Sequence, residues 1–113
     1  MVPMEAVFFS ADGAVHSLRV MDDPPGATLD GRPLLLPPPE WVLLRQLTQC
    51  AGQPVSRKAL LRALWGGGSA YVTRIVDVYV YRLRKRCPLL PIETAYQVGY
   101  QLNALLMGEP RQK

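Results

Sequence analysis

TRIVDVYVYRLRKRC, residues 73–87, is the stretch that decides the fold of this chain. Its apolar residues recur at about 100° per residue, which predicts an amphipathic helix. The apolar face consists of Val76, Val80, Leu83 and Cys87. The opposite face is basic and aromatic, and it consists of Arg74, Val78, Tyr81 and Lys85, with Arg82 on its flank. Such a face suits a grooved polyanion such as DNA, and the alternative is a helix whose basic face is only solvated.

Length and composition indicate one globular domain. The chain has 113 residues, of which 49% are hydrophobic and 19% are charged, and these values exclude a disordered protein. No apolar run approaches the roughly 18 residues of a membrane span, so we expect no membrane partner. The N-terminus lacks a basic region and contains Glu5, which is not typical of a signal peptide. We therefore expect a cytoplasmic location.

The sequence lacks the usual patterns of catalytic and metal-binding sites. Cys50 and Cys87 are too few for a disulfide framework or a zinc site, and each is expected to be a buried thiol. His16 lies in an alternating pattern, where a surface or edge position is the simplest interpretation. Paired carboxylates, a nucleophile with a base, and a phosphate-binding glycine motif are all missing at a usable spacing. We expect neither an enzyme nor a metal or cofactor site.

Charge divides the chain into an acidic first part and a basic second part. Residues 1–40 carry six acidic and two basic residues, a net charge of −4. Residues 41–113 carry three acidic and eleven basic residues, a net charge of +8. The basic part favours a polyanionic partner, and the acidic part is expected to keep its own surface away from that partner.

Residues 1–36 are expected to form an antiparallel sheet of four strands. The predicted strands are residues 5–10, 14–20, 27–29 and 32–36. Ala11-Asp12-Gly13 and Asp30-Gly31 are typical of hairpin turns, and residues 21–26 are expected to form a wider turn rich in Asp and Pro. Because two hairpins alone are marginally stable in water, this sheet must pack against the residues that follow.

Two further helices are predicted before residues 73–87. Pro37-Pro38-Pro39 begins the first, since proline is tolerated in a first turn, and Ala51-Gly52 ends it. Ser56 is a suitable N-cap for the second. The buried side of the second helix is expected to consist of Leu60, Leu61, Leu64 and Trp65. The boundary residues that follow are Gly66-Gly67-Gly68 after the second helix, and Thr73 and Pro88 on either side of the third.

A C-terminal β-hairpin completes the predicted fold. Residues 92–95 and 100–104 are predicted strands around the loop 96–99, and residues 105–113 are expected to be a tail. The whole order predicts an α+β winged helix-turn-helix domain with residues 37–104 as its DNA-binding core. In that architecture the third helix enters the major groove, and the hairpin, or wing, reaches the minor groove or the backbone. We therefore expect sequence-specific binding of double-stranded DNA by a transcription regulator.

These segments resemble the C-terminal effector domain of OmpR/PhoB-type response regulators, over residues 29–102. The motifs that carry the resemblance are Leu36–Leu44, Val55–Arg57 with Leu60–Gly66, Arg74–Lys85, Ile92–Thr94 and Val98–Tyr100. In two-component systems this domain is normally joined to a receiver of about 120 residues, the size of one domain. Because these 113 residues leave no room for a receiver, the chain is either a free-standing winged helix or the effector part of a longer protein.

The resemblance implies roles for individual residues. Arg82 is expected to read guanine, because an arginine fork matches its O6 and N7 atoms, and Val78 is expected to contact thymine methyl groups. Tyr81 is the third candidate for base reading. The expected contacts to the DNA backbone are Arg57, Trp65, Arg74, Arg84, Lys85, Thr94 and Tyr100.

Some of these residues have a simpler interpretation. Arg57 and Lys85 are only solvated cations in the alternative, and Trp65 is only a core residue. Asp77 is expected to pair with a nearby arginine inside the protein, because a carboxylate that faces phosphates is repelled.

Three places depart from the pattern of the family. Tyr81 stands where a small or basic residue is frequent, and the wing tip reads Tyr96-Gln97 where Arg-Gly is frequent. An arginine suits the negative potential of a narrow minor groove, and a glycine accepts a positive φ without strain, so wing contacts are expected to be weaker here. The third place is loop 66–72, which contains the triple glycine Gly66-Gly67-Gly68. This loop corresponds to a segment that contacts RNA polymerase in some members.

A second class of function stays open from the sequence. Tyr79, Tyr81 and Tyr96 suit a protein interface, which favours a protein-interaction module, such as an antirepressor, as the alternative. If the chain binds DNA, a homodimer on repeated half-sites is expected, and a monomer that pairs only on DNA fits equally well.

Overall fold

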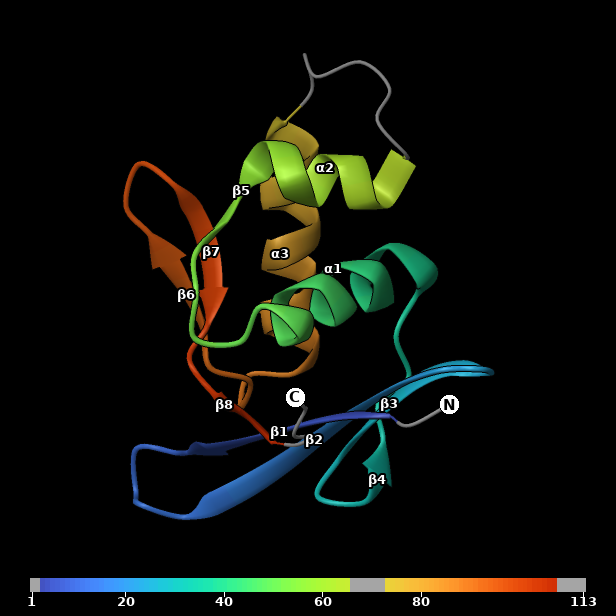
Figure 1. Ribbon diagram of the computed structural model, residues 1–113, viewed down its shortest axis with the longest axis vertical. Helices are drawn as coiled ribbons and strands as arrows, with labels where there is room; N and C mark the ends of the chain where they lie inside the picture. Colours follow the sequence, from blue (N-terminus) through green and yellow to red (C-terminus); the bar gives the residue numbers. More distant parts are fainter. Residues whose placement is uncertain (1–2, 66–72, 108–113) are drawn as a thin grey trace, which may run out of the picture.

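A computed structural model describes residues 3–65 and 73–107. One layer is a five-stranded antiparallel sheet, and three helices with a smaller three-stranded sheet form the other layer (Figure 1). The large sheet consists of β1 (Met4–Phe9), β2 (Val15–Asp22), β3 (Pro25–Leu29), β4 (Arg32–Pro33) and β8 (Leu105–Met107). The small sheet consists of β5 (Val55–Ser56), β6 (Ile92–Ala95) and β7 (Gly99–Leu102). The helices are α1 (Pro38–Gln49), α2 (Arg57–Trp65) and α3 (Arg74–Arg86).

The large sheet joins strands from both ends of the chain. Its order is β4-β3-β2-β1-β8, so that β1 pairs with both β2 and β8. Side chains alternate along β1, with Ala6 and Phe8 buried in the core and Phe9 exposed. The four predicted strands are present, but the prediction of a tail from residue 105 is wrong for residues 105–107, because they form β8. Residues 108–113 of that predicted tail lie outside the described residues.

Strand boundaries differ from the prediction where the pairing partner is distant. β2 continues to Asp22 and β3 begins at Pro25, and these two residues pair, so the turn expected at 21–26 is much shorter. β4 ends at Pro33 instead of continuing to residue 36. Val55–Ser56 pairs with β7 as strand β5, and the local sequence pattern does not predict this partner. Such pairings depend on contacts across the fold, which a local pattern does not report.

The caps of α2 and α3 differ in outcome. The Ser56 Oγ accepts a hydrogen bond from the Ala59 N–H at 3.0 Å, which confirms Ser56 as the cap of α2. Thr73 is the residue before α3, as the sequence predicts, but its side chain makes no capping hydrogen bond to the helix. The reason is its backbone, which is already helical at φ −60° and ψ −20°, whereas a capping side chain needs an extended residue. The predicted end of α2 at Gly66–Gly68 lies outside the described residues.

The core lies between the large sheet and the helices, and α3 belongs to it along one side. Val76, Val80 and Leu83 have no exposed surface, as the periodicity of this helix predicts. The fully buried leucines of the other elements are Leu18, Leu43, Leu44, Leu47, Leu60 and Leu102. Each buried leucine stabilises the fold by about 1.5–3 kcal/mol, so α3 is held firmly and its opposite side stays outside. Within residues 3–65 and 73–107, the structure contains no helix that is both long and apolar enough to cross a membrane.

Candidate nucleic-acid interface

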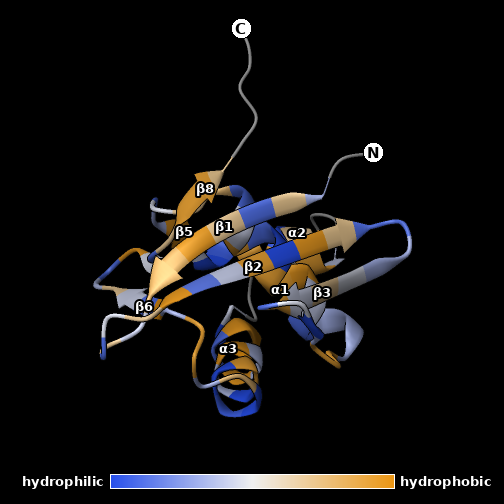
Figure 2. Cartoon of the chain, turned by 90° about the horizontal axis from the view of Figure 1, so that it is seen from below, coloured by the Kyte–Doolittle hydropathy of each residue, from blue (hydrophilic) through white to orange (hydrophobic). Residues whose placement is uncertain are grey.

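The outward side of α3 carries the side chains that the sequence predicts for contact with DNA. Its exposed residues are Arg74, Val78, Tyr81, Arg82 and Lys85. Figure 2 looks along α3 and shows hydrophilic residues on the side turned away from the rest of the chain. Tyr81 is 60% exposed and Val78 is 39% exposed, so apolar groups lie among the cations. This surface therefore offers both donors and apolar contacts, the two kinds of contact by which base edges are read.

Two of the exposed cations lie against aromatic rings of the same helix. The guanidinium carbon of Arg82 is 5.6 Å from the ring centroid of Tyr79, and the Nζ atom of Lys85 is 5.9 Å from that of Tyr81. Residues three and four positions apart are neighbours on a helix, so these contacts follow from the sequence spacing. Because a cation is attracted to the face of an aromatic ring, Tyr79 helps to orient Arg82 before any partner arrives.

Asp77 lies where α2, α3 and β7 meet, and it has the internal partner that the sequence predicts. The Arg57 Nε donates to Asp77 Oδ1 at 2.8 Å, and the Tyr100 hydroxyl donates to the same oxygen. Partial burial acts to raise the pKa of Asp77, but these hydrogen bonds outweigh it and hold the pKa below its ordinary value. Tyr100 is 5% exposed, and burial together with its bond to Asp77 raises the pKa of its hydroxyl.

Arg84 joins α3 to the wing. Its Nη2 donates to the Ile92 carbonyl at 3.0 Å and to Thr94 Oγ1 at 3.1 Å, and its Nε donates to the same carbonyl at 3.3 Å. Its guanidinium carbon also lies 5.3 Å from the ring centroid of Tyr100. Several residues predicted to contact the DNA backbone are therefore engaged with one another inside the protein, and their contact with DNA stays a prediction.

A second ion pair connects α3 to α1. Arg86 donates to the Glu40 carboxylate from Nε at 2.7 Å and from Nη2 at 3.3 Å, and Glu40 is 2% exposed. A buried carboxylate is costly without a partner, so this pair fixes the end of α3 against the start of α1. The local sequence pattern does not predict this pair, because 46 positions separate the two residues. The exposed cations of α3 without such a carboxylate contact among the described residues are Arg74, Arg82 and Lys85.

The wing tip combines an exposed aromatic residue with a strained backbone. Tyr96 is 84% exposed, and Gln97 has a φ of 62°, the positive value that the missing glycine would have accepted more easily. Gly99 follows at the start of β7, where a Cβ atom would overlap the Val55 carbonyl oxygen. Glycine is therefore required where the wing crosses β5, and the strained position is at the tip.

Trp65, at the end of α2, is 54% exposed, which shows that the prediction of a buried side chain was wrong for this residue. Leu60 and Leu61 are buried and Leu64 is half-buried, so burial along the apolar side of α2 decreases toward Trp65. An indole N–H is a donor that can reach an acceptor such as a phosphate oxygen.

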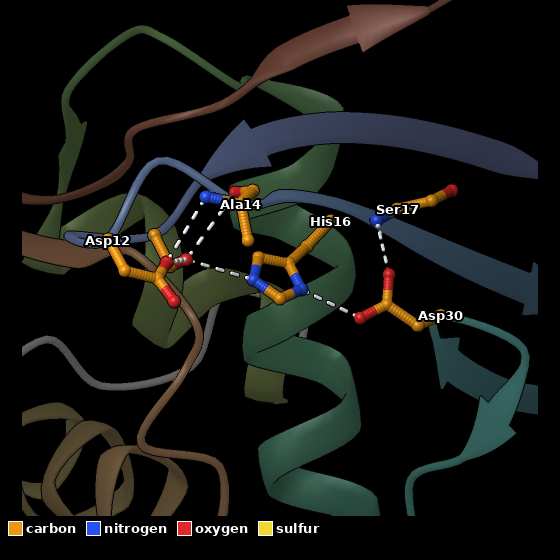
Figure 3. Close-up of polar contacts among 6 residues, drawn as sticks. Asp12, Ala14, His16, Ser17 and Asp30 are labelled. Atoms are coloured by element: carbon orange, nitrogen blue, oxygen red, sulfur yellow. Dashed lines mark hydrogen bonds and ion pairs between the residues drawn. The ribbon is translucent and has the colours of Figure 1, made fainter.

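His16 belongs to a polar network at the turns of the large sheet (Figure 3). Its Nδ1 lies 2.7 Å from Asp30 Oδ2 and its Nε2 lies 3.1 Å from Ser10 Oγ. These are the residue types of a catalytic triad, but the Ser10 hydroxyl donates to Asp12, so its proton is not held by the histidine. Asp30 also accepts a hydrogen bond from the Ser17 N–H at 2.9 Å. The network therefore stabilises the turns of the large sheet. His16 is half-buried near the start of β2, where β2 pairs with β1 but not with β3, so it lies at a local edge of the sheet as the sequence predicts.

Comparison with known proteins identifies relatives of this chain. A family model described as "Transcriptional regulatory protein, C terminal" matches residues 31–102. The transcriptional regulatory protein CseB of Streptomyces coelicolor is 42% identical over 74 residues, which are 66% of this chain and 32% of that protein. The transcriptional regulatory protein QseB of Escherichia coli O157:H7 is 35% identical over 106 residues, covering 88% of this chain and 48% of that protein. The chain thus spans a third to a half of the length of these relatives.

Similar solved structures include two DNA-binding domains. The DNA-binding domain of Klebsiella pneumoniae RstA, in complex with the RstA box, has a TM-score of 0.68 and 27% identity over 87% of this chain and 96% of that one. The DNA-binding domain of Bacillus subtilis CssR has a TM-score of 0.65 and 33% identity over 75% of this chain and 98% of that one. The α+β winged helix-turn-helix fold predicted from the sequence is therefore confirmed.

Proposed function

Because this chain belongs to the family of C-terminal domains of transcriptional regulatory proteins, we propose that it binds double-stranded DNA sequence-specifically and regulates transcription. The resemblance to OmpR/PhoB-type effector domains is confirmed by the family match. The family is one of transcription regulators and not of enzymes. The observation that carries the proposal is the division of α3 into a fully buried side and an exposed side with Arg82 among apolar groups.

In this proposal residues 37–104 form the DNA-binding core and α3 enters the major groove. Arg82 reads a guanine, Val78 contacts thymine methyl groups, and Tyr81 is the third base-reading residue. The remaining proposed contacts go to the DNA backbone, from Trp65, Arg74, Lys85 and Thr94. Phosphate contacts supply affinity and register, so the choice of sequence rests on α3.

The wing has a smaller part in the proposal. It lies against the minor groove or backbone through Tyr96 and Gln97, which offer a ring and an amide where an arginine would insert more deeply. The RstA domain, whose structure contains its DNA box, has the same fold, which supports double-stranded DNA as the partner of this fold. The contact with RNA polymerase that the resemblance suggests involves residues 66–72, which lie outside the described residues.

Selection of bound sequences from a random DNA pool tests the proposal directly. We expect one enriched motif, and an affinity whose logarithm falls linearly with the logarithm of the salt concentration, by about 0.9 per neutralised phosphate. Arg82→Ala should relax the motif at one guanine. Arg32→Ala, which removes an exposed cation from β4, is the matched control and should leave the motif intact. A pool without enrichment, or an affinity independent of salt, contradicts the proposal.

A protein-interaction module is the second candidate, because Tyr81 and Tyr96 are large and exposed. A stable protein partner whose binding is lost in Tyr81→Ala, in a chain that selects no DNA motif, would favour it. We also propose that two copies of the chain bind repeated half-sites on the DNA. The proposed location is the cytoplasm. Sedimentation with DNA that carries one or two half-sites distinguishes a dimer from a monomer that pairs only on DNA.

A further inference from the structure

We propose that four side chains act as a clamp that sets the position of the wing relative to α3. The clamp residues are Arg57, Asp77, Arg84 and Tyr100. The proposal rests on the proposed function, since it states how the two DNA-contacting elements keep their relative position. It gives these residues a positioning role inside the protein, whereas the sequence predicts that Arg57, Arg84 and Tyr100 contact the DNA backbone.

Tyr100 is the centre of the clamp. Its ring lies 5.1 Å from the guanidinium carbon of Arg57 and 5.3 Å from that of Arg84, measured to the ring centroid. Its hydroxyl donates to Asp77 Oδ1, the same oxygen that accepts from Arg57. One buried ring thus contacts two cations from different helices, and the charge of Asp77 offsets the repulsion between them.

The clamp attaches both strands of the wing to α3 at separate points. Near the start of α3, Asp77 holds β7 through Tyr100. Near its end, Arg84 holds β6 through the Ile92 carbonyl and Thr94 Oγ1. Seven residues of helix, about 10 Å, separate the two points. Two attachments at this distance restrict rotation of the wing as well as translation, which a single contact does not.

The hydrogen bonds of Tyr100 argue against direct contact with DNA. A tyrosine hydroxyl has one hydrogen to donate, and here it is donated to Asp77. An ionised phosphate oxygen only accepts hydrogen bonds, so Tyr100 offers it no donor while its hydroxyl is bonded to Asp77. Tyr100 as a whole is also only 5% exposed, which leaves little surface for a phosphate to reach.

Hydrogen exchange without DNA is the first test. Tyr100→Phe keeps the ring and its volume and removes only the hydroxyl. Loss of one hydrogen bond should speed exchange of the wing amides, residues 92–102, about fivefold, while the amides of α1 exchange as before. Unchanged exchange in the wing overturns the proposal, whether or not the chain binds DNA.

DNA affinity against salt is the second test, with the sequence selected above. Tyr100→Phe and Asp77→Ala should each weaken binding about fivefold, with the slope against salt unchanged, because no phosphate contact is lost. Lys85→Gln is the comparator and should reduce the slope by about 0.9. The sign for Asp77→Ala is decisive, since electrostatics alone predicts tighter binding when an acidic group is removed.

Tighter binding of DNA by Asp77→Ala contradicts the clamp proposal. A reduced slope of affinity against salt for Tyr100→Phe also contradicts it. Arg84→Lys provides a further check, because it keeps the charge but loses the planar fork that reaches both Ile92 and Thr94. It should behave like Tyr100→Phe in both tests. If the wild-type chain selects no DNA, the proposed function fails, and the exchange experiment still decides whether the clamp holds the wing.

Discussion

Leu83→Ala tests whether the buried side of α3 holds this helix in place. Leu83 has no exposed surface and belongs to the hydrophobic core. Transfer of a buried leucine side chain accounts for about 1.5–3 kcal/mol, and the cavity left behind adds to this. We therefore expect the free energy of unfolding to fall by about 3 kcal/mol, a large share of the 5–15 kcal/mol that is typical of a domain.

Urea denaturation of the wild-type chain, Leu83→Ala and Arg82→Ala measures this effect with a neighbouring control. At about 1–3 kcal/mol per molar urea, the midpoint of Leu83→Ala should fall by roughly 1–3 M. Arg82→Ala removes an exposed side chain one position away and should stay within about 0.5 kcal/mol of the wild type. A loss below about 1 kcal/mol for Leu83→Ala, or equal losses for both variants, would refute the assignment of the two sides of α3.

Three further predictions concern recognition, the wing and pH. Arg82→Ala should lower discrimination at its guanine about tenfold to a hundredfold in competition binding, and equal losses on all sequences would contradict base reading. Gly99→Ala should open the wing or prevent folding, because its Cβ would overlap the Val55 carbonyl oxygen; a circular dichroism melt like that of the wild type would contradict this. The lowered pKa of Asp77 means that its contribution to stability is complete above its ordinary value of 3.8 and is lost as the pH falls through the lower folded value. The raised pKa of Tyr100 means that its contribution is complete below 10.0 and is lost as the pH rises through the higher folded value. The free energy of unfolding should therefore depend less on pH at the acid end in Asp77→Asn, and less at the alkaline end in Tyr100→Phe. Curves of this free energy against pH that match the wild type would show that the two groups are not linked to folding.

The large departures from sequence-based expectation share one feature, which is distance along the chain. The pairing of β8 with β1 brings residue 107 to residue 5, and the Arg86–Glu40 pair spans 46 positions. Trp65 sits in an apolar pattern but is exposed, because helical periodicity says which residues share a side and not where a neighbouring element ends. In the two pairings the deciding contact is made by a residue that the local pattern does not contain, and for Trp65 it is the absence of a covering element among the described residues that the pattern does not report.

The sequence by itself determined the two sides of α3. Val76, Val80 and Leu83 are buried while Arg82 and Tyr81 are exposed, since the helical period places them there whatever the surroundings. It also determined the order of sheet, helices and wing, because turns and caps act over a few residues. Only the tertiary structure decided what Tyr100 and Arg84 do. Both lie in motifs that resemble those of a DNA-binding family, but packing brings the Tyr100 hydroxyl to Asp77 and the Nε and Nη2 of Arg84 to the wing, and these contacts join residues that are far apart in the sequence.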